Sequence, residues 1–458
     1  MSGATAAHAS YNGSGTQGLA VTNKINDTGD IMSVFWTKDK TTKQLLHGSA
    51  LIEIPSSGGT EIPGSNLTFT MNSDMDVIGD LYVYATLTFG GSTIITKEYG
   101  LLNLFDRIEF QCGTQIWQTL EFADILALNT TELSEGGYEN FILSAGGFYD
   151  TSGVAGLASN GSIDLTAEAN TTRAFSFRLP MLTRKLGPML NDYSNISESG
   201  FLTAAAPNQT VKIKIYTNRT ATMVANAMIS ASSTTDRMNV RLYGKHMIMC
   251  NEEREKIRSI PGGIAKRLKL TQYRDVINPT ITQTAVANTG GLCTVELDCD
   301  HFSLYASHII IQIFDNTVYN SSDNFKLGGI SSTDYNDECC TLISADLKLN
   351  STSFCGLLTG GMMSGPLPES MGLYVNNFNS RTDPHTRTIV YVFPLANKAF
   401  SGSGVPLNRF DNIRLALRIY VPERAATDVN AEIRRISATC VGETTALYKQ
   451  GAASISMY

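Results

Sequence analysis

The sequence predicts an all-β protein built from two antiparallel sandwiches in tandem. Charged residues make up only 17% of the chain, against roughly a quarter in average domains, while glycine occurs 39 times. This composition is typical of short strands connected by loops. Strand-length segments of period-two hydrophobicity run through residues 66–250, and after a break the same pattern starts again. Because 458 residues are more than one sandwich usually contains, two sandwiches explain the pattern best.

The clearest strand of the first half is at residues 81–89. Leu81, Val83 and Ala85 alternate there with tyrosines and threonines. This alternation places apolar side chains on one face and polar side chains on the other, as in a half-buried strand. Further strands of this half are predicted at residues 66–71, 107–111, 174–179, 211–216 and 240–250.

Residues 118–172 interrupt the strand pattern. Residues 118–128 predict a short helix, because Leu120, Ile125 and Leu128 form an apolar stripe. Residues 129–172 are polar, rich in Gly, Asn and Ser, and longer than an ordinary connection. They predict a long surface loop above the first sandwich.

The second half repeats the organisation of the first. Strands are predicted at residues 295–299, 307–314, 345–349, 388–393 and 413–421. Strands do not alternate with helices of 10–15 residues, which argues against Rossmann and barrel-enzyme architectures. An internal repeat supports tandem copies of one fold: Asn-Val-Arg-Leu at 239–242 precedes Glu-Arg at 253–254, and Asn-Ile-Arg-Leu at 412–415 precedes Glu-Arg at 423–424.

These patterns predict three regions. Residues 1–30 are poor in apolar side chains and predict a flexible N-terminal arm. Residues 31–255 contain the first sandwich, and residues 256–458 the second. The Pro-Gly-Gly sequence at 261–263 predicts a linker between them, because proline cannot donate to a strand ladder and glycine adds freedom.

Charge and composition exclude several classes of protein. The net charge of −7 provides no positive field for a nucleic-acid backbone. No apolar run reaches the ~20 residues of a membrane-spanning helix, and residues 1–20 lack the pattern of a secretory signal. Eight cysteines are too sparse for a disulfide framework, which favours a reducing compartment.

Several short motifs occur in a fixed order from about residue 50 to the end. Near the C-terminus these are Phe-Pro-Leu at 393–395, Ser-Gly-Ser-Gly at 401–404 and Asn-Arg-Phe-Asp-Asn-Ile-Arg-Leu at 408–415. Leu-Tyr at 242–243 is followed by Asn-Glu-Glu-Arg at 251–254. Weaker motifs lie at residues 108–113, 178–190 and 345–350. The ordered set resembles the signature of double jelly-roll major capsid proteins, the family that builds the shells of large eukaryotic DNA viruses and virophages.

This resemblance implies two eight-stranded jelly rolls with short helices and long loops. It also implies a structural major capsid protein of the virion, assembled inside the host cell, with no catalytic, cofactor-binding or metal-binding residues. Three copies would form a pseudo-hexagonal capsomer, and capsomers would tile an icosahedral shell. The implied partners are the chain itself as a homotrimer, neighbouring capsomers, and minor capsid or penton proteins. An internal membrane could be a further partner; specific nucleic acid is not expected.

Two other classes of function stay open. Asn-, Ser- and Thr-rich loops on tandem sandwiches would also suit a carbohydrate-binding protein or adhesin. A β-sandwich hydrolase would need a convergent acid/base or metal site, and the nearest group to one is Cys293, Cys299 and His301. Core packing explains these cysteines better than zinc. Asp383 and His385 are close in sequence, but Asp-Pro mostly begins a turn.

Three surface features are also expected from the sequence. The charged run at 252–256 predicts a solvated face, or else ion pairs between subunits. Basic clusters at 38–43 and 256–269 could line an inner shell surface. Asn-x-Ser/Thr sequons, among them those at Asn66, Asn129, Asn208 and Asn350, are better explained by asparagine in turns than by glycans.

Overall fold

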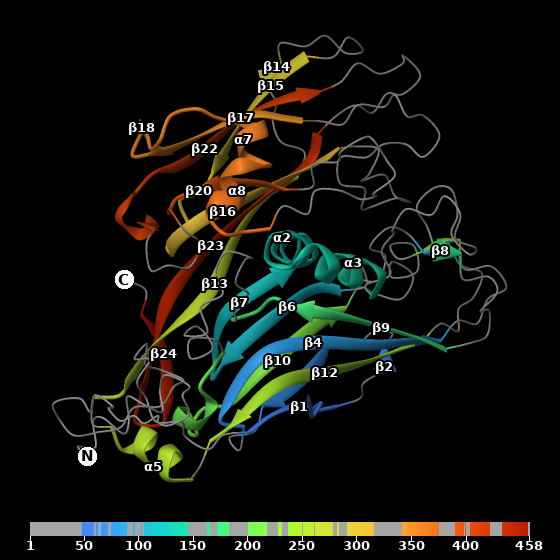
Figure 1. Cartoon of the computed structure of the whole chain (residues 1–458), viewed down its shortest axis with the longest axis vertical. Helices are drawn as coiled ribbons and strands as arrows, with labels where there is room; N and C mark the ends of the chain where they lie inside the picture. Colours follow the sequence, from blue (N-terminus) through green and yellow to red (C-terminus); the bar gives the residue numbers. More distant parts are fainter. Residues whose placement is uncertain are drawn as a thin grey trace, which may run out of the picture.

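The fold is described from a computed structural model of the whole chain. The structure describes residues 48–456 with gaps, the longest of which are 145–162, 183–199, 218–227, 316–340, 375–389 and 422–432. The predicted arm at 1–30, the basic cluster at 38–43 and the Asp383–His385 pair therefore lie outside the described residues. Figure 1 shows two β-rich halves stacked along the long axis of the molecule.

The first half is an eight-stranded jelly roll of two sheets. One sheet has the order β1-β12-β4-β9, from β1 (Gly48–Ile54), β12 (Arg237–Ile248), β4 (Val77–Thr88) and β9 (Thr172–Leu179). The other has the order β3-β10-β6-β7, from β3 (Leu67–Met71), β10 (Val211–Thr217), β6 (Phe105–Cys112) and β7 (Gln115–Glu121). In β3, for example, Leu67, Phe69 and Met71 are buried while the threonines between them are partly exposed, as alternation requires.

Short strands extend the first half. β2 (Glu61–Ile62) pairs with β12, and a small separate sheet contains β11 (Met228–Ser230), β5 (Ile95–Thr96) and β8 (Ile163–Asp164). A 3-10 turn, η5 (Thr203–Ala205), lies between β9 and β10 in sequence. Helix α5 (Asn251–Ser259) follows β12 and precedes the first strand of the second half.

The second half is a jelly roll of the same topology. One sheet has the order β13-β23-β16-β20, from β13 (Ile264–Ile277), β23 (Ile433–Lys449), β16 (Tyr305–Asp315) and β20 (Tyr391–Pro394). The other runs β14-β15-β22-β17-β18, from β14 (Thr282–Gln283), β15 (Gly291–Asp298), β22 (Ile413–Val421), β17 (Thr341–Leu349) and β18 (Thr352–Ser353). The remaining elements are β19 (Leu358–Thr359), α7 (Gly360–Met363), α8 (Pro366–Ser370), β21 (Val405–Pro406), η6 (Leu407–Arg409) and β24 (Ala452–Ser456).

The eight main strands of each half are connected identically. Numbered along the chain, they form sheets in the order 1-8-3-6 and 2-7-4-5 in both halves, and the described pairings are antiparallel. The predicted all-β fold with two tandem eight-stranded jelly rolls is therefore confirmed. The internal repeat, however, does not mark equivalent strands: residues 239–242 lie in β12, the eighth strand of its roll, whereas residues 412–415 enter β22, the seventh. The predicted correspondence between these motifs is wrong.

The region predicted as a helix and surface loop differs from expectation. Residues 118–121 belong to β7, and the helix α2 (Phe122–Glu132) begins four residues later than predicted. A second helix, α3 (Glu135–Ser144), then occupies the start of the predicted loop, and Asn129 and Glu132 are buried. Residues 129–144 are thus not a surface loop, because they form the end of α2, which is buried, and the helix α3. Residues 145–162 lie outside the described part.

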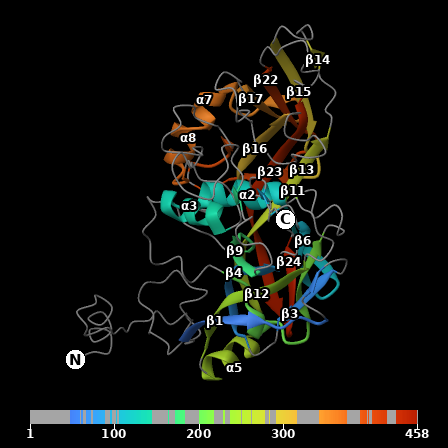
Figure 2. The ribbon, with the colours of Figure 1, turned by 90° about the vertical axis from the view of Figure 1, so that its right-hand side faces the viewer.

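The two rolls share one hydrophobic core in addition to the second roll's own. The larger cluster joins first-roll residues such as Leu128 and Phe201 to second-roll residues such as Leu268 and Tyr448. Figure 1 shows why: β13 and β23 extend from the upper roll down alongside the lower roll, and β24 pairs with β23 there. Figure 2 shows α2 and α3 at the level where the two rolls meet.

Candidate functional site: the contact between the two jelly rolls

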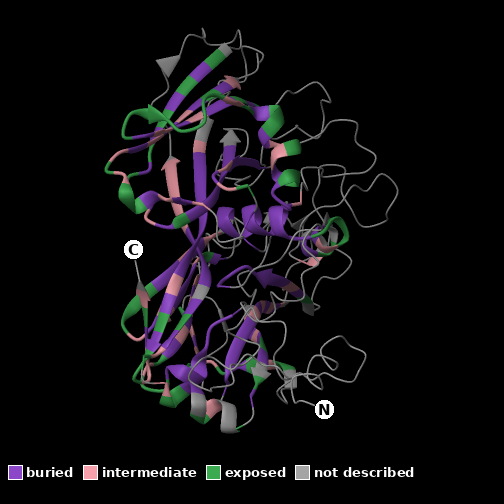
Figure 3. Cartoon of the chain, turned by 60° about the vertical axis from the view of Figure 1, so that its left-hand side comes forward, coloured by how far each residue is buried: buried purple, intermediate pink, exposed green. Residues whose placement is uncertain are grey.

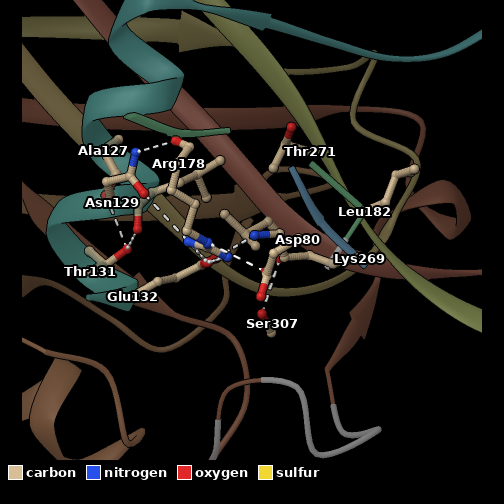
Figure 4. A network of polar contacts seen from close by, with 12 residues as sticks. Asp80, Ala127, Asn129, Thr131, Glu132, Arg178, Leu182, Lys269, Thr271 and Ser307 are labelled. Carbon is tan, nitrogen blue, oxygen red and sulfur yellow. Dashed lines mark hydrogen bonds and ion pairs between the residues drawn. The ribbon is translucent and has the colours of Figure 1, made fainter. Parts of the chain in front are cut away.

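A buried cluster of charged side chains lies where α2 meets the second roll. Glu132, at the end of α2, accepts hydrogen bonds from both Nη1 and Nη2 of Arg178 on β9, each at 3.0 Å. Its other oxygen accepts a hydrogen bond from Nζ of Lys269 on β13. Figure 4 shows these side chains converging from the two rolls. One carboxylate therefore holds a cation from each roll, in a place where water is excluded.

Asn129 and Asp80 complete the coordination of Arg178. Asn129 Nδ2 donates to the backbone oxygen of Arg178 at 3.1 Å, and Asn129 Oδ1 accepts from Arg178 Nη1 at 3.4 Å. Asp80 Oδ1 lies 3.6 Å from Arg178 Nε. The sequon at Asn129 is thus a structural asparagine in the folded chain, since its amide is buried and engaged on both sides.

The cluster is balanced in charge. Glu132 and Asp80 face Arg178 and Lys269, so two carboxylates oppose two cations. Burial lowers the pKa of Lys269 to about 8, although the charge of Glu132 opposes this shift. Burial, together with the charge of Lys269, lowers the pKa of the neighbouring His308 to about 3, so this imidazole is neutral at pH 7. Buried charges are tolerated when they are paired and hydrogen-bonded in this way.

The other end of α2 is also bound to the second roll. Asp124 closes a capping box by accepting a hydrogen bond from the backbone N–H of Glu121 at 3.0 Å, and its other oxygen accepts from Thr439 Oγ1 of β23 at 2.6 Å. Arg435 of β23 donates to Glu121 Oε2 and to Asp275 Oδ1, both at 2.8 Å. Polar contacts at both ends therefore fix α2 on the second roll.

We expect stability to depend on pH through Asp124. Burial raises the pKa of its carboxyl to about 7, against the opposing effect of the Thr439 hydrogen bond. Between the unfolded pKa of 3.8 and the folded pKa, the folded chain binds the extra proton. Stability from this group is therefore fully present below pH 3.8 and is lost as pH rises through about 7. Asp124→Asn keeps one of the two acceptor oxygens and removes the titration. Urea unfolding at pH 5.5 and 8 should show the variant gaining on the wild type as pH rises; an unchanged difference would contradict this assignment.

An apolar contact joins the rolls at the far end of β23. The ring of Tyr448 packs edge-on against Phe201 at 5.5 Å between centroids, and Phe201 packs against Phe110 at 5.3 Å. The Tyr448 hydroxyl accepts a hydrogen bond from the backbone N–H of Leu202 at 3.2 Å. Just beyond it, the backbone N–H of Ala453 donates to Gln209 Oε1 at 2.7 Å. The C-terminal hairpin of the second roll is therefore part of the wall of the first.

The residues considered for metal binding do not form a metal site. Cys293 and Cys299 are buried in the second roll's core. His301 is exposed, and its Nε2 is 2.9 Å from the backbone oxygen of Tyr273. Within the described residues, no group of three or more His, Cys, Asp or Glu side chains could hold a metal ion. Likewise, no helix in the described part of the chain is long and apolar enough to cross a membrane.

Two predicted surface features are corrected. In the charged run at 252–256, Arg254 is not simply solvated: its guanidinium binds buried Asp76 through Nε and Nη2, at 2.7 and 2.8 Å. This pair ties α5 to the start of β4. The basic cluster at 256–269 is only partly a surface feature, because Lys266 and Lys269 are buried whereas Arg258 is exposed. These two side chains are three residues apart on β13 and so lie on opposite faces of the strand, which means that β13 is covered on both faces here.

Sequence patterns alone did not find the Glu132–Arg178–Lys269 cluster. Its members are 46 to 137 residues apart and come from three elements. The available signal was the position of Glu132 one turn after the apolar residues Ile125 to Leu128, where a charged side chain must either reach water or meet a buried partner. What the assembled contact can do is mechanical: it fixes the orientation of one jelly roll against the other.

The chain has the double jelly-roll fold of solved viral major capsid proteins, as the sequence resemblance predicted. VP54 of PBCV-1, fitted into a reconstruction of the virophage Sputnik, matches with a TM-score of 0.64 at 13% identity, covering 90% of this chain and 97% of that one. The Faustovirus major capsid protein matches with a TM-score of 0.56 at 10% identity, covering 89% and 92%. A Sputnik virophage structure matches with a TM-score of 0.52 at 10% identity, covering 96% and 92%. No protein-family model and no curated protein sequence matches the chain. At these identities the likeness establishes the fold.

Proposed function

We propose that this protein is a structural major capsid protein of a virion. The observation that carries the proposal is the extent of the structural match: both jelly rolls and the connection between them align with VP54 over nearly the whole of each chain. A likeness confined to one sandwich would suit many binding proteins. The match here extends over both jelly rolls in one alignment, and the proteins that match in this way are capsid proteins.

The rigid contact between the rolls supports this role. In a shell, each chain must present two lobes at one angle to all of its neighbours, because repeated contacts close only if their geometry is repeated. The buried cluster around Glu132 and the Tyr448 contact hold that angle from two ends of the interface. The proposed function thus accounts for charges that an ordinary core would not contain.

The finer parts of the proposal concern assembly. Three copies would give six similar lobes in a pseudo-hexagonal capsomer, and capsomers would tile an icosahedral shell assembled inside a host cell. Neighbouring capsomers and minor capsid or penton proteins would be its partners, with no enzymatic role. We propose residues 31–255 and 256–458 as the two rolls, preceded by the arm at 1–30. No specific contact with nucleic acid is part of the proposal.

Size in solution tests the proposal. Purified full-length protein should sediment at three times the chain mass, and negative-stain micrographs should show hexagonal particles of six lobes. A protein that stays monomeric up to high micromolar concentration, or that binds a glycan array as a monomer, would contradict the capsid role and favour the carbohydrate-binding alternative. The measurement needs no partner and no ligand.

A further inference from the structure

One buried histidine of the first roll has no hydrogen-bond partner. His246 lies on β12, and its side chain has no exposed surface. In the part of the chain that the structure describes, neither Nδ1 nor Nε2 of the ring has a hydrogen-bond partner. Buried polar groups are normally hydrogen-bonded, so each exception needs an explanation. The contact between the two rolls does not supply one, because His246 is not among the residues that form it.

The ring of His246 lies on the core side of its sheet. Its cross-strand neighbours are Ala50 on β1 and Ile78 on β4, and directly opposed residues share a face of the sheet. Gly244 leaves room for the ring, because a side-chain carbon at Gly244 would lie 3.1 Å from His246 Nε2 and 3.2 Å from Ile54 Cδ1. The sequence thus provides space for an imidazole without a group that binds it.

Within the described residues, the charged side chains around His246 are engaged elsewhere. Asp76, just before β4, accepts hydrogen bonds from Arg254 at 2.7 and 2.8 Å and from the backbone N–H of Met249 at 2.7 Å. The other charged side chains at this end of the sheet lie on its outer face: Glu53, Asp80, Arg241 and Lys245. Across the core, β3, β6 and β10 direct apolar side chains and the thiol of Cys112 toward the sheet. The imidazole therefore has no anionic neighbour on its own side of the sheet that is free to pair with it.

The environment of His246 disfavours its protonated form. Burial lowers the pKa of the imidazole from its ordinary value of 6.5. Below pH 6.5 the folded chain therefore binds fewer protons than a chain in which the ring is exposed to water. The stability that this group contributes is fully present above pH 6.5 and is lost as the pH falls below that value.

The neighbouring strand β1 is the weakest part of the wall around His246. It is the edge strand of its sheet and, in the described part of the chain, pairs with β12 alone. Ala50 is exposed although it shares a face with the buried ring, so water reaches this face of the sheet one strand away. Figure 1 shows β1 at the lower border of the first roll, and Figure 3 shows purple, buried segments along the strands of that roll.

We infer that His246 is an acid-sensitive switch whose protonation releases the edge strand β1 from β12. A buried charge without a partner is costly, so the imidazolium must reach water. Separation of β1 opens a path to water beside Ala50, whereas separation of β4 would expose the centre of the roll. Acidification thus frees the first strand of the roll while the rest of the roll keeps its core. The inference goes beyond the proposed capsid function and does not depend on it.

The test of this switch must be local. The pKa values of Asp124 and His308 are also shifted by burial, and both groups lie where the two rolls meet. Acidification stabilises the fold through Asp124 and destabilises it through His308, because the first pKa is raised and the second is lowered. A global unfolding curve therefore combines three groups, whereas the exchange of the β1 amides reports on this strand.

Hydrogen exchange of the full-length protein at pH 7.5 and 5.5 tests the inference, with each rate expressed as protection relative to an unfolded chain. Protection of the amides of β1 should fall by up to about tenfold between these pH values, because opening is coupled to the uptake of at most one proton. His246→Leu removes the titration and should abolish this fall. His246→Met is a second apolar variant, in case leucine packs badly beside Gly244. His301→Gln, at an exposed histidine of the second roll, is the matched control and should respond to pH as the wild type does.

The amides of β22, in the second roll, provide an internal reference. At pH 5.5 they should stay better protected than those of β1, because only the edge strand opens. Equal protection of the two strands at pH 5.5 would mean that acid unfolds the whole chain, and the inference would be wrong. It would also be overturned if β1 of the wild type kept its protection at pH 5.5, or if both folded His246 variants lost as much protection as the wild type.

Discussion

Replacing Glu132 with alanine should destabilise the protein by about 3–5 kcal/mol, one of the two largest single effects that the structure predicts. The change leaves the ammonium of Lys269 and the guanidinium of Arg178 buried without the carboxylate that both contact. Asp80, at 3.6 Å from Arg178, can compensate only one of them. Urea unfolding at a fixed protein concentration measures the loss, since association would otherwise shift the apparent stability.

Two further variants separate charge from packing at this site. Glu255, on α5, has a side chain that is 75% exposed, so Glu255→Ala should change stability by no more than about 0.5 kcal/mol. The double variant Glu132→Leu with Lys269→Met replaces a buried pair by apolar side chains and should recover part of the loss seen in Glu132→Ala. If Glu132→Ala cost no more than the Glu255 control, the cluster would not be holding the rolls together.

The alternation of apolar and polar side chains predicted the strands that have one face on a core and the other face exposed to solvent. The segment 81–89 and strand β4 agree because Leu81, Val83 and Ala85 face a core while the tyrosines between them face outward. The jelly-roll connectivity followed from the resemblance to a family and not from the alternation itself. Strands with one buried and one exposed face were therefore predictable from local sequence.

Strands β13 and β23 could not be predicted in this way. Each serves both rolls, so each is covered on both faces for part of its length, and the polar and apolar positions no longer alternate. Lys269 is fully buried on β13 because its partner Glu132 lies 137 residues away. From the sequence alone, a lysine-rich segment such as residues 256–269 is expected on the protein surface, because the buried acidic partner of Lys269 is not visible in the local sequence. The Glu132–Arg178–Lys269 cluster could not be predicted for the same reason. Its opposite charges are far apart in the sequence and come together only in the folded chain.

The helix α2 shows how a correct pattern can be placed wrongly. The predicted helical stripe includes Leu120, yet this residue belongs to β7, whose buried residues include Trp117 and Gln118. The chain changes from strand to helix without a loop, so a window spanning both gives a mixed period. The capping box of Glu121 and Asp124 marks the true start of the helix.

Replacing Tyr448 with alanine should cost about 3–5 kcal/mol, and the damage should appear in the first roll although Tyr448 belongs to the second. Its ring fills a buried site against Phe201, and its hydroxyl accepts the backbone hydrogen bond of Leu202. Tyr448→Phe keeps the ring and removes only the acceptor, so it should cost about 1–2 kcal/mol. Hydrogen exchange provides the spatial test: amides around Leu202 and in β10 should exchange faster in Tyr448→Ala, while those of β22, in the outer sheet of the second roll, should change less. Faster exchange confined to the second roll would mean that the two rolls are stabilised separately, and that the C-terminal hairpin does not unite them into one rigid building unit.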